Sequence, residues 1–517
     1  MIRNHLLNKI GQLFVVGFTG TSVTDEMKKL IHDYQVGHVI LFSRNIGSPE
    51  EVRQLTSALQ NEAKKAGHTK PLLICLDQEN GIVRRLKEPV TVFPGPMSLG
   101  AADDLELCFD IGLATGHELK ELGINWNLAP VVDVNNNPNN PVINVRSFGG
   151  SPQKVARLAA SWFKGQQSAG VASTLKHFPG HGDTDVDSHL DLPVIHHSLE
   201  RLFDSELIPF VEGIKQEADV IMSAHIYFSA LEQEFGKPAT LSRNVLTELL
   251  RKKLGFNGVI TTDCLEMNAI SETVGVAKGA VEAIKSGADL AMISHTFERQ
   301  VCAIEALEKA VIDGEITENE IEQHYQRIMN LKDKYTGSWT EVLKESVDFE
   351  FVGSNRHRVL SKLAYQKSVT MIKNNTSNKW NEFHKIYALF PKYIPLNQAE
   401  DKRDRSPIEE ALIRYDVPIL PYEINEDIND FHFKSEDLKI LFIYSLSKKD
   451  FYSSWVQSMI NKPNTMVISV RGPYPFKEMG DIQNGICVYD DAIEAIHAAL
   501  DVGLGRSQAD GRLPVSL

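Results

Sequence analysis

The stretch GVASTLKHFPGHGDTDVDSH, residues 170–189, joins an apolar run to a loop that is crowded with titratable side chains. The run 171–175 is apolar or small and leads directly into Lys176 and His177. Proline and glycine then follow, and they interrupt regular structure. A loop of histidines and aspartates at the end of a buried strand is a place where proton transfer is expected.

Two other interpretations of this loop exist. Its Asp-x-Asp-x-Asp pattern from Asp183 resembles a calcium loop, but Ser188 takes the sixth position in place of glycine and Val194 the twelfth in place of glutamate. No HExxH or CxxC pattern supports zinc. We therefore expect no metal here. A simple solvated turn is the second alternative, and the remainder of the chain argues against it.

Similar apolar runs recur through the first two-thirds of the chain and alternate with amphipathic segments. The runs are continuous, as expected for strands buried on both faces. One intervening helix is predicted after Ser48, which is followed by Pro49 and Glu51 in a capping pattern. Eight β-then-α units in about 330 residues predict a (β/α)8 TIM-type barrel. The runs are 13–18, 37–42, 71–77, 124–134, 171–178, 218–225, 258–263 and 288–294.

Several of these runs end on a polar residue. The carboxyl ends of the strands of such a barrel share one face, which is where active sites lie. A polar residue at one strand end can simply cap a turn, but six strand ends converging on one rim indicate a site. The terminal residues are Asp77, Asp133, Lys176 with His177, His225, Asp263 and Ser294.

A second α/β pattern follows a polar connector. Apolar runs at 367–374, 385–390, 438–446, 464–470 and 484–490 alternate with helical stretches, which predicts a smaller α/β domain with an open sheet. We place the catalytic barrel at 1–335, the linker at 336–360 and the second domain at 361–517.

The composition narrows the range of possible partners and compartments. The 517 residues carry a net charge of -14, which disfavours nucleic acid or an anionic membrane as a partner. The five cysteines are scattered and favour a reducing compartment. Neither a secretory signal nor a membrane span is evident, so we expect a cytoplasmic protein.

Four separated motifs together identify a family. The segment 176–189, with LDQENGIVRRL at 76–86, NPVINVRSF at 140–148 and GFNGVITTDCLEM at 255–267, resembles the glycoside hydrolase family 3 β-N-acetylglucosaminidases of the NagZ type. The resemblance extends to 357–375 and to GRLPVS at 511–516, which are similar to the domain that follows the barrel in two-domain members. It implies that the second domain, 361–517, is an αβα sandwich.

The resemblance implies a retaining mechanism. Asp263 matches the nucleophile that forms a covalent glycosyl-enzyme. Asp187 and His189 match an acid/base dyad on a mobile loop. An imidazole titrates near ~6.5 and can both give and take a proton near neutral pH, and a neighbouring aspartate orients it. The matching substrate-binding residues are Asp77, Arg85, Arg146, Lys176 and His177.

The chain departs from the family pattern within its DQE motif. Asn80 stands where glycine is common, and asparagine tolerates a positive φ better than most residues. Ile82 stands where arginine is frequent. The second change affects what binds beyond the first sugar and leaves the core reaction intact.

The sequence thus predicts a cytoplasmic exo-β-N-acetylglucosaminidase. The family role implies cell-wall recycling, with GlcNAc–MurNAc fragments or muropeptides as substrates and no cofactor or metal. A phosphorylase on the same scaffold is one alternative, because a histidine acid/base repels phosphate less than a carboxylate would. A β-glucosidase, which the 182–189 loop disfavours, and a catalytically inactive sugar-binding protein are the others.

Overall fold

A closed barrel of eight parallel strands forms the first part of the molecule, in the order β1-β12-β11-β9-β7-β6-β3-β2. This confirms the predicted TIM-type barrel, because each apolar run contains one strand. The computed structural model describes residues 2–185, 192–344, 348–374, 383–393, 395, 399–400, 403, 405–424, 433–445, 451–480 and 482–517. The barrel strands are β1 (Phe14–Val16), β2 (His38–Ile40), β3 (Leu73–Leu76), β6 (Trp126–Asn127), β7 (Ala172–Phe178), β9 (Val220–Ser223), β11 (Val259–Cys264) and β12 (Leu290–Ile293).

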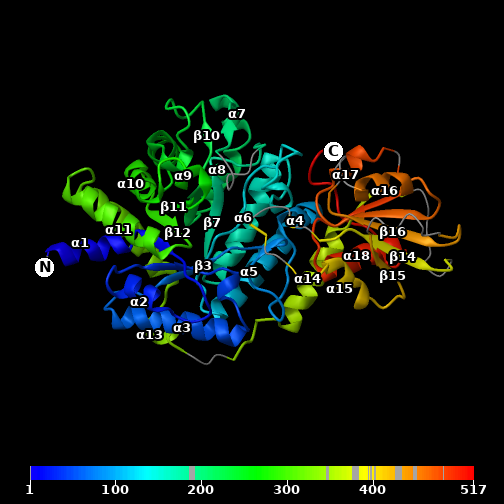
Figure 1. Cartoon of the computed structure of the whole chain (residues 1–517), viewed down its shortest axis with the longest axis horizontal. Coiled ribbons are helices and arrows are strands. Elements are labelled where there is room, and N and C mark those ends of the chain that lie inside the picture. Colours follow the sequence, from blue (N-terminus) through cyan, green and yellow to red (C-terminus); the bar gives the residue numbers. More distant parts are fainter. Residues whose placement is uncertain are drawn as a thin grey trace.

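Helices surround this barrel, as Figure 1 shows. The predicted cap is present: the Ser48 side chain accepts from the backbone N–H of Glu51, whose carboxylate accepts from the backbone N–H of Ser48. The outer helices are α1 (Ile2–Gly11), α2 (Asp25–His32), α3 (Pro49–Lys65), α5 (Leu105–Glu121), α6 (Pro152–Ser168), α8 (Ile208–Lys215), the π-helix η4 (Asn244–Lys253), α10 (Val276–Ser286), α11 (Phe297–Ile312) and α12 (Glu318–Tyr335).

The loops that follow the strands carry short elements of their own. After β3 comes a hairpin of β4 (Gln78–Asn80) and β5 (Val83–Arg84). Asn80 adopts φ +67° in this hairpin, as expected for asparagine in place of glycine. The other short elements are η1 (Ser43–Asn45), α4 (Pro96–Ala102), η2 (Asn144–Arg146), β8 (Val194–Ile195), α7 (Leu199–Asp204), β10 (Tyr227–Phe228), η3 (Ala239–Leu241), α9 (Asn268–Ser271) and α13 (Trp339–Val342).

The second part of the molecule contains a six-stranded sheet in the order β13-β18-β17-β16-β14-β15. Only β13 runs antiparallel to its neighbour among these strands. The strands are β13 (Thr370–Asn374), β14 (Ile386–Phe390), β15 (Leu420–Glu423), β16 (Leu438–Ile443), β17 (Thr465–Ser469) and β18 (Asn484–Cys487), and the helices are α14 (Asn355–Ser368), α15 (Pro407–Ile413), α16 (Phe451–Met459), α17 (Pro475–Glu478) and α18 (Ile493–Gly503).

Helices cover both faces of this sheet, which confirms the predicted sandwich. Alternate residues of β14 belong to different buried clusters: Ala388 packs with α15 and α18, whereas Leu389 packs with α16. The sequence did not predict β15, because it is an exposed edge strand that contains a proline. The exact domain boundaries remain a prediction.

The hairpin of β4 and β5 joins the two parts. Ile82 and Val83 of the hairpin lie in the same buried cluster as Leu389, Leu441 and other residues of the second sheet. The segment that carries the DQE motif is therefore held between barrel and sandwich, and any side chain on it is positioned by both.

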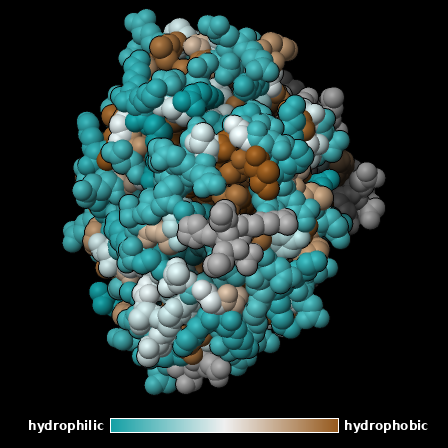
Figure 2. All heavy atoms as spheres, turned by 90° about the vertical axis from the view of Figure 1, so that its left-hand side faces the viewer, coloured by the Kyte–Doolittle hydropathy of each residue, from teal (hydrophilic) through white to brown (hydrophobic). Residues whose placement is uncertain are grey.

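Figure 2 shows the face of the molecule that lies on the left-hand side of Figure 1. This face is mostly hydrophilic, with small hydrophobic patches. Within the part of the chain that the structure describes, no helix combines the length and apolar character needed to cross a bilayer.

Buried histidine in the barrel gives the fold a pH dependence. His68 is 8% exposed, and its Nε2 lies 3.1 Å from the carbonyl oxygen of Ile31. Burial, with the nearby Lys332 ammonium adding to it, lowers the pKa of His68 to about 4. In the unfolded chain the pKa of this histidine is ~6.5. Between that pH and about 4, the unfolded chain therefore binds a proton at His68 that the folded chain does not bind.

We therefore expect stability to fall as the pH drops from 6.5 toward 4. His68→Gln should flatten that dependence, because glutamine cannot be protonated. The melting temperature measured at intervals between pH 7.5 and 4 checks this, with the half-exposed His32→Gln as control. Equal slopes in wild type and His68→Gln would contradict the assignment.

Candidate active site

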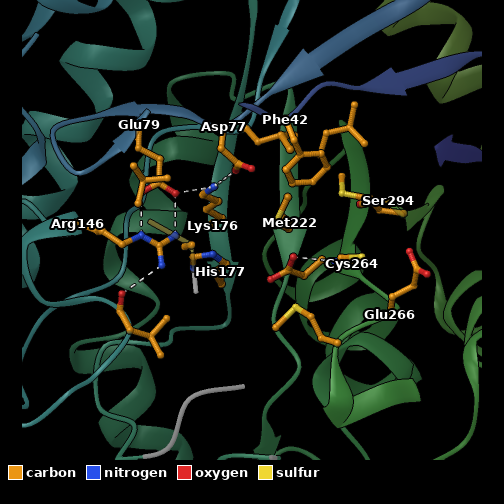
Figure 3. Close-up of a pocket in the computed structure, with 18 of the residues that line it drawn as sticks. Phe42, Asp77, Glu79, Arg146, Lys176, His177, Met222, Cys264, Glu266 and Ser294 are labelled. Atoms are coloured by element: carbon orange, nitrogen blue, oxygen red, sulfur yellow. Dashed lines mark hydrogen bonds and ion pairs between the residues drawn. The ribbon is translucent and has the colours of Figure 1, made fainter. Parts of the chain in front are cut away.

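A cavity of about 470 Å³ opens at the carboxyl ends of the barrel strands. This volume lies in the range of roughly 300–1,000 Å³ that small-molecule sites occupy. Figure 3 shows a group of charged side chains on one side of it, with Cys264, Glu266 and Ser294 opposite. The residues used below that line it are Phe42, Asp77, Glu79, Arg85, Arg146, Lys176, His177, His181, Asp263, Cys264, Glu266, Ser294, His295 and Ala399.

Glu79 is the centre of the charged group. Its two carboxylate oxygens accept from Arg146 in a bidentate pair, with Nε to Oε2 at 2.8 Å and Nη2 to Oε1 at 2.7 Å. Lys176 Nζ lies 2.7 Å from the same Oε1. The side chains of all three are at most 5% exposed. One carboxylate thus fixes two cations that come from different elements of the barrel, Arg146 from η2 and Lys176 from β7.

The protonation states follow from this arrangement. Burial alone would raise the pKa of Glu79, but Arg146 and Lys176 more than offset it and hold that pKa well below its usual range. Burial would lower the pKa of Lys176, yet Asp77 and Glu79 raise it overall. All three groups are therefore charged at neutral pH, and such charge-assisted hydrogen bonds are stronger than neutral ones.

Asp77 connects this group to the second domain. Its Oδ1 accepts from Lys176 Nζ at 2.8 Å, and its Oδ2 lies 3.4 Å from Arg85 Nη2. The Nη1 of Arg85 donates to the carbonyl oxygen of Ala399 at 2.9 Å. Arg84 points elsewhere, since its guanidinium lies 3.9 Å from Asp490. Between these adjacent arginines, Arg85 is therefore the one in the cavity, and a sandwich-domain segment holds it.

His177 is oriented by a buried aspartate. Its Nδ1 lies 2.8 Å from Asp133 Oδ2, and the backbone N–H of His181 donates to Asp133 Oδ1 at 2.7 Å. Burial would raise the pKa of Asp133, but His177 and His181 together lower it. Burial and the neighbouring His177 lower the pKa of His181 to about 4. The Asp133 carboxylate thus fixes the ring of His177 at the cavity wall.

Asp263 lies near the end of β11 and reaches the cavity from another strand. Its Oδ1 accepts from the backbone N–H of Cys264 at 2.7 Å. The residue is only partly buried, so its carboxylate is accessible to a ligand while one oxygen is fixed by the backbone.

Six residues predicted from the sequence line this one cavity: Asp77, Arg85, Arg146, Lys176, His177 and Asp263. Asp187 and His189 lie outside the described residues.

Sequence reasoning assigned no role to Glu79, Asp133 and Ala399. The first two carried a signal, since Glu79 lies within the DQE motif and Asp133 ends a strand. Ala399 carried none, because its backbone oxygen makes the contact.

Two groups of described side chains could hold a metal ion: Cys264, Glu266 and His295 in this cavity, and Asp183, His197 and Glu206 elsewhere.

Removing the central carboxylate tests this arrangement. Glu79→Gln leaves Arg146 and Lys176 buried with less compensating charge, and we expect it to cost about 3–5 kcal/mol of stability. Glu88→Gln is a matched control, because Glu88 pairs with Arg414 at 3.1 Å but is 54% exposed, and it should cost at most about 1 kcal/mol. Chemical denaturation of the wild type and both variants measures these changes in the free energy of unfolding. Equal small effects would contradict the central role of Glu79.

Comparison with known proteins agrees with this geometry. Residues 5–331 match the glycosyl hydrolase family 3 N-terminal domain. Beta-hexosaminidase A of Pseudoalteromonas piscicida is 36% identical over 378 residues, covering 69% of this chain and 62% of that protein. A beta-hexosaminidase of Alkalilimnicola ehrlichii is 36% identical over 285 residues, covering 54% of this chain and 79% of that protein.

A solved structure extends the likeness to both domains. The glycoside hydrolase family 3 beta-N-acetylglucosaminidase from Paenibacillus sp. str. FPU-7 is 36% identical, covers 99% of both chains and superimposes with a TM-score of 0.91. The first part of the chain matches the family domain, and the whole chain matches a two-domain member. This chain therefore belongs to glycoside hydrolase family 3.

Proposed function

We propose that the protein is a retaining exo-β-N-acetylglucosaminidase. The observation that carries this is the convergence of Asp263 with the Asp77, Arg146 and Lys176 group in one cavity at the strand ends of the barrel. Relatives of similar sequence are named hexosaminidases and a β-N-acetylglucosaminidase. An accessible carboxylate opposite a rigid set of donors suits the nucleophile and the sugar-binding part of a retaining glycosidase.

Asp263 is the proposed nucleophile. The backbone N–H of Cys264 fixes one of its carboxylate oxygens. A carboxylate held in this way can attack the anomeric carbon and form the covalent glycosyl-enzyme of a retaining reaction. The transition state resembles an oxocarbenium ion, so a nearby negative charge also stabilises it. Water then releases the sugar.

The charged group opposite is proposed to hold the sugar. Asp77 can accept hydrogens from sugar hydroxyls, while Arg146 and Lys176 donate to hydroxyl oxygens. A lysine ammonium has three donors, and contacts with Asp77 and Glu79 use two of them, which leaves one for substrate. Glu79 fixes both cations before substrate arrives, and this preorganisation reduces the entropic cost of binding.

The proposed acid/base is His189 paired with Asp187, on the strength of the family motif alone. Among the described residues, Asp133 and His177 also form an aspartate–histidine pair, and His177 lines the cavity. His177 is a competing candidate for proton transfer to the leaving oxygen, and kinetics can separate the two.

The proposed natural substrates are GlcNAc–MurNAc fragments or muropeptides from cell-wall recycling, in the cytoplasm. The family role supports the substrates, and five free cysteine thiols are compatible with a reducing compartment.

Release of nitrophenol tests the reaction class. With 4-nitrophenyl β-N-acetylglucosaminide and the corresponding β-glucoside, each with and without phosphate, we expect fast release from the N-acetyl substrate alone and free GlcNAc as product. Phosphate-dependent formation of GlcNAc-1-phosphate would make the protein a phosphorylase. Equal cleavage of the glucoside would contradict the proposed specificity, and no turnover would leave only a binding protein.

Replacing the nucleophile should separate binding from turnover. We expect Asp263→Ala to reduce kcat by at least about 10⁴-fold and to keep the affinity for GlcNAc within a few-fold, because the sugar-holding group is intact. Single-turnover kinetics and calorimetric titration with GlcNAc measure the two effects. A rate near that of wild type would show that the nucleophile is another residue.

Leaving-group dependence identifies the acid. His189→Ala should slow substrates with poor leaving groups about 10²- to 10⁴-fold and activated nitrophenyl substrates much less, because a nitrophenolate needs no proton. His177→Ala is the matched comparison and should weaken all substrates alike. If the dependence on leaving group appears in His177→Ala instead, the buried pair is the acid.

A further inference from the structure

Three side chains with metal-ligating atoms meet on the wall of the sugar cavity. Cys264 is the last residue of β11, Glu266 follows two positions later, and His295 lies two positions after the end of β12. These strands are paired, with Cys264 beside Met292, so their carboxyl ends bring the three residues together. One ligand atom from each lies within 4.8 Å of the others.

The chemistry of this set suits one class of ion. A thiolate, a carboxylate oxygen and an imidazole nitrogen are the ligands that Zn²⁺ binds, at about 2.0–2.3 Å in tetrahedral geometry. Ligand atoms around such an ion are about 3.3–3.8 Å apart, so a small convergence of the side chains suffices. Softer sulfur disfavours Mg²⁺ and Ca²⁺.

Glu266 has an unsatisfied oxygen at this place. Its side chain is 4% exposed, and its Oε2 accepts from the backbone N–H of His295 at 2.6 Å. Its Oε1 is buried and has no hydrogen-bond partner among the described residues, and Arg299 Nη1 is 3.6 Å away. The ion pair with Arg299 at this distance compensates the buried carboxylate oxygen only in part, and a metal ion at about 2.0–2.2 Å would compensate it more fully.

From this geometry we propose that Cys264, Glu266 and His295 bind a thiophilic divalent cation of the zinc class. The ion replaces the thiol proton of Cys264, which passes to solvent, and water from the cavity completes the coordination. His295 is exposed, which provides a path for the ion. This site is separate from the residues proposed for catalysis, and its ion takes no part in the reaction.

Two nearby cations oppose the site: Arg299 Nη1 forms an ion pair with Glu266 Oε1 at 3.6 Å, and Arg44 lies beside Ser294. The Arg44 guanidinium donates to the carbonyl oxygen of Ser294 at 2.7 Å and lies 4.4 Å from the ring centroid of Phe42. Its charge reduces the attraction for a metal ion without occupying any of the three ligand atoms in these contacts. We therefore expect moderate affinity, as suits a reversible inhibitor.

The other group of potential ligands is the natural control. His197 Nε2 already lies 2.6 Å from Asp183 Oδ2. Glu206 accepts from Asn136 at 2.9 Å and from Arg201 at 3.3 Å. These ligand atoms have closer protein partners than Glu266 Oε1 has in Arg299 at 3.6 Å, and they include no sulfur, so this group should bind a thiophilic ion more weakly.

A bound ion should inhibit turnover, because Cys264 directly follows Asp263. This consequence rests on the proposed function, whereas the site itself does not. Ion binding is therefore measured directly and inhibition is measured separately.

The test uses the full chain, treated with a chelator and titrated with Co²⁺ and then Zn²⁺. We expect one equivalent of Co²⁺ to produce the near-ultraviolet thiolate-to-metal absorption band and Zn²⁺ to displace it. Cys264→Ser should abolish the band, and Cys264→Ser and His295→Ala should each weaken Zn²⁺ binding at least tenfold. Two control variants should leave the Co²⁺ band and the Zn²⁺ affinity unchanged: Cys302→Ser, which removes an exposed thiol, and His197→Gln.

The cysteine-to-serine substitutions are nearly isosteric, so they should leave the fold intact. The melting temperature of each variant, compared with that of the wild type, verifies this. No band in the wild type, a band that persists in Cys264→Ser, or loss of the band in Cys302→Ser or His197→Gln would overturn the site. Zn²⁺ should also inhibit nitrophenol release, with the inhibitory concentration raised at least tenfold in His295→Ala relative to that variant's own uninhibited rate. An unchanged concentration would overturn the inhibition and not the site.

Discussion

The buried carboxylate of Glu79 supports the rest of the site. Arg146 and Lys176 are too polar to be buried alone, and they come from different elements of the barrel, η2 and β7. The opposite charge of Glu79 and its good hydrogen-bond geometry offset the free energy that it costs to remove these two cations from water. Once they are fixed, Lys176 fixes Asp77, and the cavity has a rigid polar wall before any sugar enters. Preorganised charge of this kind is effective in catalysis because it needs no reorganisation during the reaction.

The hairpin of β4 and β5, which carries Glu79, connects the site to the second domain. The hairpin that contains Glu79 has its apolar residues in the buried cluster shared with the sandwich sheet, and Arg85, directly after β5, donates to the carbonyl oxygen of Ala399. Ala399 precedes Glu400, whose carboxylate is held by the buried Arg471 at 2.7 Å. The sandwich domain thus contributes to the shape of the cavity through backbone and packing, although no catalytic residue is assigned to it.

The sequence predicted the barrel well because its strands are buried on both faces and read as continuous apolar runs. The cavity residues that end those runs were predictable for the same reason. Glu79 was missed because its role depends on cations that lie far along the chain, and Ala399 because a carbonyl oxygen has no sequence signature. The exposed strand β15 lacked the apolar run that marked its neighbours. Asp187 and His189 rest on the motif alone.

Covalent trapping tests the central claim most directly. A fluorinated N-acetylglucosaminyl fluoride that forms the glycosyl-enzyme but hydrolyses slowly is incubated with the protein, which is then digested and analysed by mass spectrometry. The account predicts a single added sugar on the peptide that contains Asp263 and none in Asp263→Ala. A label on another carboxylate, or undiminished turnover with no label, would contradict it.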